Sequence, residues 1–249
     1  MKIAITGSRG FIGSHLKTRL EKDGHEIVEW DLKQEPSRCI KDFDPSDINY
    51  CIHLAAYADV RASLKDPQKY WKNNVENTTR IQNICHHNNI PLLYASSSCI
   101  HNWWLSPYGI SKKVNEETAF DGQTALRFTT VYGDGARESM LIGKLLNGSI
   151  PYLTRHTRDF IHVDDVISAI KTIMDTPVEK RKRAYDIGTG KGVVVNELGA
   201  LAGWEGIEVT DGDPCEAQNN TADNSELKIL GWKPTIDIEE YIIKYTIPH

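Results

Sequence analysis

The chain has 249 residues, which is enough for one substantial core or for one domain with a smaller companion. Apolar residues make up 40% and charged residues 25%, an ordinary balance for a globular protein. The formal net charge of -5 gives no electrostatic reason to expect nucleic acid or an anionic membrane as partner. An anionic small ligand therefore has to be held by local features.

The five cysteines are an odd number, and none of them forms a C-x-x-C pair. This pattern is typical of reduced thiols in a cytosolic protein rather than of a disulfide framework or a zinc site, so we expect no metal. The first residues, MKIAITG, run directly into a strand pattern and leave no place for a signal peptide. No apolar stretch reaches the roughly 20 residues of a membrane helix. We expect a cytoplasmic protein with no nucleic-acid partner and no membrane partner.

Short apolar or β-branched runs alternate with helical patterns over the first 132 residues. The runs predict strands near 2–5, 25–30, 50–56, 90–97 and 124–132. Between the first two, Phe11, Ile12, Leu16 and Leu20 form an apolar stripe at helical spacing, and residues 70–87 behave similarly. Such alternation predicts an α/β fold with a doubly wound parallel sheet that binds ligands at the carboxyl ends of its strands.

After residue 132 the regular alternation weakens. The patterns there predict helices over 139–146 and 166–174, a returning strand over 183–190, and two more helices after Val193. We expect a main domain over 1–131 that the segment 158–188 rejoins. A smaller lobe is then built from two separated segments, 132–157 and 189–249.

A glycine-rich loop, "ITGSRGFIGSHL", follows the first predicted strand and opens the first helix. Gly7, Gly10 and Gly13 allow a tight turn and let backbone N–H groups and the helix N-terminus approach a pyrophosphate. Asp31 ends the second predicted strand, about 20 residues on, where a carboxylate holds the adenosine ribose hydroxyls. The carboxylate favours NAD over NADP, whereas Arg9 within the loop points the other way because it could accept a 2′-phosphate.

Tyr108 and Lys112 lie four residues apart in "SPYGISKK", eleven residues after Ser97 at the end of a predicted strand. An unperturbed tyrosine ionises near pH 10, so it is a poor base at neutral pH. An ammonium one helical turn away and the positive charge of an oxidised nicotinamide would lower the pKa of that phenol. A serine hydroxyl could then bind the same substrate oxygen while the phenolate removes a proton.

These features together resemble the extended short-chain dehydrogenase/reductase family, in particular its branch of nucleotide-sugar epimerases and dehydratases. The resemblance rests on the Ser97, Tyr108 and Lys112 set and on "TGSRGFIGSHL", "HLAA", "ADVRASLKDPQKYWKNNV", "LRFTTVYG", "RDFIHVDDV" and "LGWKP". It implies a Rossmann-type NAD-binding domain and a small C-terminal substrate-binding lobe. It also implies a reaction that begins by oxidising a sugar carbon to a ketone.

The resemblance also assigns residues to the two ligands. It implies cofactor contacts by Gly7, Arg9, Gly10, Phe11, Ile12, Gly13, Asp31, Asp42, Phe43, Leu54, Ala55, Ala56, Asn74, Tyr108 and Lys112. It implies substrate contacts by Ser97, by Thr130, which stands where relatives carry an asparagine, and by Arg158, whose alternative role is a structural salt bridge. The segment "DGDPCEAQNNTAD" lacks the second arginine that relatives use for phosphate, and Arg137 is our hypothesis for its replacement.

The residues after Ser97 distinguish reactions within the branch. Dehydratases that resemble this chain carry Asp-Glu there, whereas this chain has Ser98-Cys99. "SSSCI" is similar to a signature of epimerases in which the cysteine moves a proton beside the ketone, which Cys99 can do if the pKa of its thiol is moderately lowered. The alternative is a small buried residue. Trp103 and Trp104 either line the substrate pocket or pack a loop that is shorter than in relatives.

Our interpretation is an NAD-dependent nucleotide-sugar epimerase, an isomerase with oxidoreductase-type chemistry, whose keto-sugar intermediate is transient. Ser97, Tyr108, Lys112 and Cys99 are the predicted catalytic residues. Two alternatives stay open. One is an NADP-dependent keto-sugar reductase or epimerase-reductase, and the other is a non-catalytic dinucleotide-binding regulatory protein. The resemblance further implies a homodimer formed by the helices that follow Asn74 and Tyr108.

Overall fold

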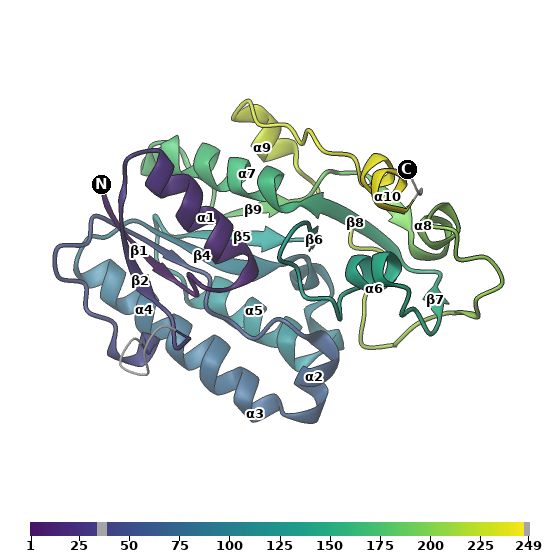
Figure 1. The fold of residues 1–249 in the computed structure, drawn as a ribbon. Helices are drawn as coiled ribbons and strands as arrows, with labels where there is room; N and C mark the ends of the chain where they lie inside the picture. The colour runs from purple at the N-terminus through teal and green to yellow at the C-terminus, as the bar shows by residue number, and fades with distance from the viewer. Residues whose placement is uncertain (34–38, 247–249) are drawn as a thin grey trace.

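The computed structural model describes residues 1–33 and 39–246. Its centre is a six-stranded sheet in which all neighbouring strands are parallel (Figure 1). The strand order is β2 (Glu26–Trp30), β1 (Lys2–Thr6), β3 (Tyr50–His53), β4 (Leu92–Ser97), β5 (Thr124–Phe128) and β9 (Ala184–Ile187). The prediction of a doubly wound α/β fold is confirmed.

Helices cover both faces of this sheet (Figure 1). One face carries α1 (Phe11–Lys22), α7 (Val163–Asp175) and α9 (Ser225–Ile229), and the other carries α2 (Val60–Lys65), α3 (Pro67–Tyr70), α4 (Asn77–His87) and α5 (Pro107–Thr118). Because side chains of a strand alternate between faces, Ile3 and Ile5 pack with the first group and Ala4 packs with α4. The two buried clusters fix β1 between both helical layers.

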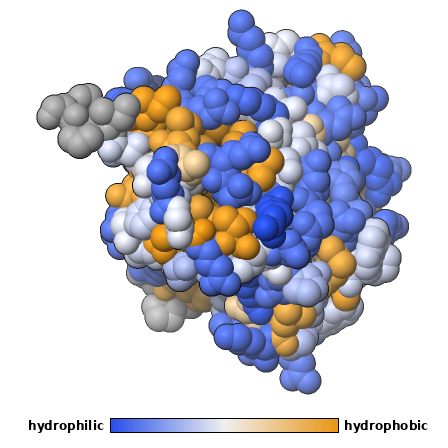
Figure 2. Space-filling model, turned by 90° about the vertical axis from the view of Figure 1, so that its right-hand side faces the viewer, coloured by the Kyte–Doolittle hydropathy of each residue, from blue (hydrophilic) through white to orange (hydrophobic). Residues whose placement is uncertain are grey.

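A smaller lobe extends from the carboxyl edge of the sheet. It contains β6 (Thr130–Tyr132), β8 (Thr157–His162) and β10 (Gly192–Val194) as one sheet, β7 (Leu153–Thr154) and β11 (Val209–Thr210) as another, and helices α6 (Leu141–Asn147), α8 (Val195–Leu201) and α10 (Ile238–Thr246). A third buried cluster, which includes Leu153, Leu198 and Ile242, holds it together. Seen from the lobe side, hydrophilic residues surround separate apolar patches (Figure 2). The domain boundaries given above stay a prediction.

The structure corrects three predictions about elements. Residues 124–132 form two strands, because the chain leaves the main sheet after Phe128 and β6 pairs with β8 instead. Residues 70–87 contain a π-helical segment, η3 (Trp71–Glu76), between α3 and α4. The described residues after Val193 form three helices, α8, α9 and α10, rather than two. Within the part of the chain that the structure describes, 3₁₀ helices form η2 (Ile40–Asp42), η4 (Ser98–Leu105) and η5 (Val178–Lys180).

The C-terminal tail returns across the main domain to α7. The buried carboxylate of Asp165 accepts hydrogen bonds from the Thr235 backbone N–H and hydroxyl and from the Ile236 N–H, at 2.8 to 3.0 Å. The Trp232 indole donates to the Ser168 hydroxyl at 2.8 Å. Over the described ranges, no helix is both long and apolar enough to cross a membrane.

Candidate active site

The glycine loop between β1 and α1 has the shape of a phosphate cradle. Gly7 has a φ of 71°, and a Cβ there would lie 2.8 Å from the Ala55 nitrogen. A Cβ on Gly13 would lie 2.1 Å from the Gly7 carbonyl oxygen. Gly10 is the N-cap of α1, and no side chain caps the helix. The loop therefore excludes larger residues and leaves the helix N-terminus open to an anion, which fits a dinucleotide pyrophosphate.

Asp31 directly follows β2, the strand that pairs with β1 beside the glycine loop. Its carboxylate accepts hydrogen bonds from the backbone N–H groups of Arg9 at 2.9 Å and Lys33 at 2.8 Å. The Arg9 guanidinium instead lies 3.7 Å from Glu29. A fixed carboxylate at this strand end disfavours a 2′-phosphate. The side chain of Arg9 is paired with Glu29, which leaves it less free to bind such a phosphate.

The other predicted cofactor residues surround this loop to different degrees. Phe11 and Ile12 are half-buried in the first turn of α1. Leu54, Ala55 and Ala56 are half-buried directly after β3, where the Leu54 N–H donates to the Thr6 carbonyl. Asp42 is exposed. Phe43 is only 4% exposed and packs on Trp30 with ring centroids 5.3 Å apart, so it belongs to the core.

Asn74 is fully buried within η3 and is engaged by the protein itself. Its carboxamide oxygen accepts from the Tyr57 N–H, and its amino group donates to the Tyr57 carbonyl, both at 2.9 Å. A weaker bond of 3.4 Å reaches the Ser111 hydroxyl on α5. Asn74 therefore holds the segment after β3 against α5, the helix that carries Tyr108 and Lys112.

Ser97, Tyr108 and Lys112 lie together at the carboxyl edge of the sheet. Ser97 ends β4, and α5 begins at Pro107 because the Ser106 hydroxyl caps it by accepting from the Gly109 N–H at 3.1 Å. The ammonium of Lys112 lies 5.7 Å from the centroid of the Tyr108 ring and donates to the Ala95 carbonyl at 2.8 Å. The structure thus brings the predicted catalytic group into one buried site.

Burial governs the electrostatics of this group. It raises the pKa of the Tyr108 phenol above its ordinary value, and the Cys99 thiol adds to that, whereas a hydrogen bond with the Ser97 hydroxyl acts in the lowering direction. Burial also lowers the pKa of Lys112 to about 8. The free protein therefore favours a neutral phenol, and Lys112 alone does not make it acidic.

Cys99 follows Ser97 in η4, and its N–H donates to the Ser97 hydroxyl at 3.2 Å. Burial raises the pKa of the Cys99 thiol, against smaller lowering contributions from the Ser97 hydroxyl and the Arg158 charge. The lowered pKa that a proton-transfer role requires is therefore not met in the free protein. A catalytic role for Cys99 stays a prediction.

The predicted substrate residues lie on the lobe side of the site. Thr130 on β6 accepts from the Asn220 amide at 3.4 Å and lines a cavity of about 320 Å³ next to α6. Arg137 is exposed, and its charge reaches Tyr70, whose ring packs edge-on against Tyr108 at 6.4 Å. Arg158 on β8 forms an ion pair of 3.0 Å with Glu216.

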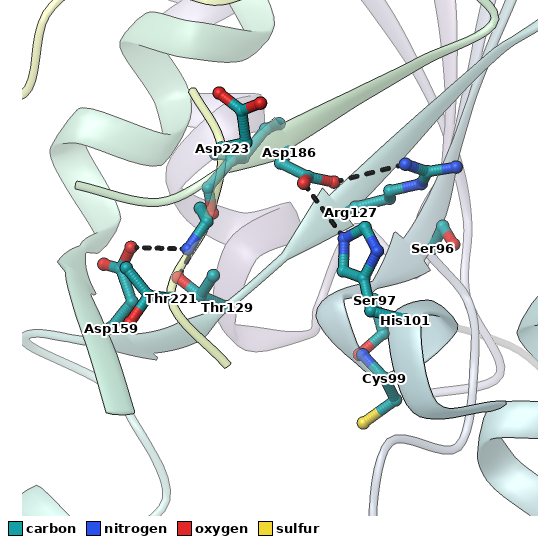
Figure 3. A network of polar contacts seen from close by, with 12 residues as sticks. Ser96, Ser97, Cys99, His101, Arg127, Thr129, Asp159, Asp186, Thr221 and Asp223 are labelled. Carbon is teal, nitrogen blue, oxygen red and sulfur yellow. Dashed lines mark hydrogen bonds and ion pairs between the residues drawn. The ribbon is translucent and has the colours of Figure 1, made fainter. Parts of the chain in front are cut away.

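A network of charged side chains behind the site was not predicted from the sequence. Arg127 on β5 donates to both carboxylate oxygens of Glu116 on α5 and also reaches Asp186 on β9, which accepts from His101 at 3.0 Å. Figure 3 shows Asp186 between Arg127 and His101, with Ser97 and Cys99 nearby. The Ser96 hydroxyl also donates to Glu116, at 2.6 Å. The network connects β4, β5 and β9 to η4 and α5. No local sequence pattern indicates it.

The described residues contain no group of three or more histidine, cysteine or acidic side chains that could hold a metal ion. His53, at the end of β3, is satisfied by hydroxyls of Thr6 at 2.6 Å and Thr78 at 2.9 Å. Burial lowers the pKa of His53 to about 3, so this histidine is a neutral structural residue.

Comparison with known proteins gives a consistent family. The model of the NAD dependent epimerase/dehydratase family matches residues 3–188. Protein CapI of Staphylococcus aureus is 28% identical, with 98% of this chain and 97% of that protein covered. A putative UDP-glucose 4-epimerase of Methanocaldococcus jannaschii is 29% identical, with 96% and 95% covered. The solved structure of MoeE5 in complex with UDP-glucuronic acid and NAD is 27% identical, with a TM-score of 0.85 and 99% of both chains covered.

Proposed function

We propose, from the premise that this chain belongs to the NAD dependent epimerase/dehydratase family, that it is an NAD-dependent nucleotide-sugar epimerase. The observation that carries the proposal is the buried set of Ser97, Tyr108 and Lys112 at the carboxyl edge of the sheet. The related proteins named as UDP-sugar epimerases support the same activity.

NAD is the cofactor that the residues fit. We propose that Gly7, Gly10 and Gly13 hold its pyrophosphate and that Asp31 holds the adenosine ribose, because the loop excludes side chains and the carboxylate is fixed beside it. Bound NAD would supply a hydride acceptor for oxidation of the sugar carbon and a hydride donor for its later reduction, so the cycle would consume no cofactor.

The protein moves the proton and orients the sugar. We propose that Tyr108 removes the proton from the sugar hydroxyl and returns it, while Ser97 binds the same oxygen. Because burial raises the pKa of Tyr108 in the free protein, we expect the phenol to ionise only when the positive charge of the oxidised cofactor joins that of Lys112. This restricts proton removal to the cofactor-bound enzyme.

The substrate, assembly and location can be proposed more narrowly than the family alone allows. We propose a UDP-linked sugar that is inverted at C4, because relatives are named UDP-glucose 4-epimerase and UDP-glucuronate 4-epimerase.

We also propose a cytoplasmic homodimer that pairs through α4 and α5, supported by the family resemblance. Light scattering that returns the mass of a single 28.1 kDa chain would contradict the dimer.

The substitution Tyr108→Phe tests the activity. We expect kcat for interconversion of UDP-glucose and its C4 epimer to fall roughly a thousandfold, because the phenol that moves the proton is gone. Calorimetry should show that NAD binding is nearly unchanged. Tyr185→Phe is the matched control, since Tyr185 is 2% exposed on β9 and bonds the Lys182 N–H.

Three outcomes would contradict the proposal in different ways. Wild-type turnover by the Tyr108→Phe variant would remove this residue from the chemistry. Tight NAD binding by the native protein without turnover of any UDP-hexose or UDP-hexuronate would favour the dinucleotide-binding regulatory alternative. Steady consumption of NADPH with a keto-sugar would favour the reductase.

A further inference from the structure

One carboxylate lies between two arginines at the junction of the main domain and the lobe. Oε1 of Glu216 is 2.8 Å from Nε of Arg61 on α2, and Oε2 is 3.0 Å from Nη2 of Arg158 on β8. Each oxygen therefore contacts a guanidinium from a different part of the fold. Glu216 itself belongs to the segment between β11 and α9, so three distant segments meet at this cluster.

Both guanidinium groups are also held by partners other than Glu216. Nη1 of Arg61 donates to the Tyr152 hydroxyl at 3.0 Å. Nη1 of Arg158 donates to the backbone carbonyls of Thr157 at 3.0 Å and Ala217 at 2.7 Å. The two arginines can therefore keep their positions when the Glu216 carboxylate turns away, which leaves a preorganised pair of cations.

A third basic side chain lies at the same place. Nδ1 of His156 is 3.9 Å from Oε2 of Glu216, and the His156 side chain is only 2% exposed. Its Nε2 has no hydrogen-bond partner among the described residues. Gly212 makes room for this ring, because a Cβ there would lie 2.1 Å from the imidazole. The other acid nearby is Asp213, 3.9 Å from Arg61.

The cluster adjoins the catalytic group. The charges of Arg158 and Glu216 both reach the Cys99 thiol, two residues after Ser97. On α2, two residues after Arg61, the Ser63 hydroxyl accepts a hydrogen bond from the Tyr108 N–H at 3.2 Å. An anion held between the two arginines would thus lie close to the predicted catalytic residues, on the Arg158 side through Cys99 and on the Arg61 side through Ser63.

We propose that Glu216 occupies the place of the substrate diphosphate, and that the diphosphate displaces this carboxylate to bind Arg61 and Arg158. The inference rests on the proposed function and adds Arg61 and Glu216 to it, whereas the sequence led us to expect Arg158 and Arg137 at the phosphates. A diphosphate carries more negative charge than a carboxylate and offers more acceptor oxygens to two guanidiniums. Glu216 therefore selects for diphosphates, because a neutral or singly charged sugar gains too little to replace it.

The test is calorimetric titration of the NAD-loaded protein with UDP and with inorganic pyrophosphate. Glu216→Gln should bind both about fivefold more tightly, because the internal competitor loses its charge. Arg61→Met should bind both about tenfold more weakly. Arg155→Met is the matched control with unchanged affinity, since Arg155 forms an exposed ion pair with Asp211.

Opposite results would overturn the inference. Equal or weaker binding by Glu216→Gln means that the carboxylate does not compete with the ligand, and unchanged binding by Arg61→Met removes that arginine from the site. A thermal shift by UDP that is larger for Glu216→Gln than for the native protein supports the inference even if the substitution lowers stability. Absence of binding of UDP and pyrophosphate to every form also overturns it. The titration measures binding and not turnover, so it can succeed or fail independently of the proposed epimerase activity.

Discussion

Lys112 carries an ammonium into a site where its side chain is almost completely buried. The pKa of Lys112 falls to about 8 because burial disfavours the charged form, even though the Ala95 carbonyl accepts a hydrogen bond from it. A lowering from the ordinary value to about 8 corresponds to about 3 kcal/mol against folding at neutral pH. Burial of Lys112 therefore lowers the stability of the fold, which is consistent with the catalytic role proposed for this residue.

The substitution Lys112→Met should separate these two effects. We expect the free energy of unfolding at pH 7 to be at least as large as in the native protein, because the aliphatic stem is kept and no charge is buried. We expect epimerase turnover to fall by more than a hundredfold, since the phenol loses the ammonium beside it. Urea unfolding and a turnover assay measure the two quantities.

The advantage of Lys112→Met in stability should depend on pH in one direction. Below pH 8 the lysine is charged in the folded and unfolded chains, so the penalty is fully present. Between pH 8 and 10.5 the folded chain releases the proton first, so native stability rises relative to the variant and the penalty fades. A difference in unfolding free energy that is constant up to pH 10.5 would contradict the burial argument.

Among the helices, α5 carries Tyr108 and Lys112 and is attached to the sheet by an ion pair between Glu116 and Arg127. Glu116 and Arg127 form a bidentate contact with a shortest distance of 2.6 Å, and their side chains are 12% and 25% exposed. The pair ties α5 to β5 next to the strand that ends in Ser97. The positions of Tyr108 and Lys112 therefore depend on an interaction outside the chemistry.

Glu116→Gln should lower the free energy of unfolding by about 2 kcal/mol, because the glutamine is uncharged and its amide nitrogen cannot accept a hydrogen bond from Arg127. Glu117→Gln is the matched control on the same helix. It breaks an exposed ion pair with Lys113 and should change stability by less than about 0.5 kcal/mol. Urea midpoints at constant slope compare the two, and equal losses would show that the buried pair has no special weight.

The elements show where sequence periodicity succeeds and where it fails. Strands β1, β3 and β4 were predictable because both of their faces are buried, which produces apolar runs such as residues 92–95. The division of 124–132 was not, because β5 and β6 are separated only by Thr129 and differ in partner rather than in residue type. The π-helical segment was hidden for a similar reason, since its residues also suit an α-helix.

At the scale of the whole molecule, one buried acid joins three segments. The carboxylate of Asp159 on β8 accepts from the Thr189 N–H and hydroxyl, the Gly190 N–H and the Ala222 N–H, at 2.7 to 3.1 Å. It thereby fixes the loop after β9 and the tail relative to the lobe sheet. These hydrogen bonds also fix the position of Arg158, which precedes Asp159 on β8.

Asp159→Asn should lower the free energy of unfolding by about 2 kcal/mol, because an amide nitrogen cannot accept bonds and leaves buried N–H groups unpaired. We also expect a raised KM for the nucleotide sugar, since the change displaces β8. Asp223→Asn is the control, because Asp223 is exposed and bonds the Ser225 N–H. A melting temperature equal to that of the control would contradict the role assigned to Asp159.

The same long-range organisation limits what the sequence could predict of the site. The set of Ser97, Tyr108 and Lys112 could be predicted from the sequence, because these residues fall within a short stretch at the end of one strand. Arg61 and Glu216 are 155 residues apart in the sequence, and neither stands in a pattern that indicates the other. Their contact follows only from the way the lobe folds back, which a single sequence does not encode locally.

The chain enters the lobe at β6, leaves it through β8 and returns to it at β10. This interleaving means that neither part is a contiguous cassette that can be expressed alone or exchanged in one piece. A chimera intended to transplant the sugar preference of a homologue must replace two stretches at once and keep Asp159 compatible with both. Laboratory evolution of substrate choice should then favour point changes in the lobe over recombination at a single crossover.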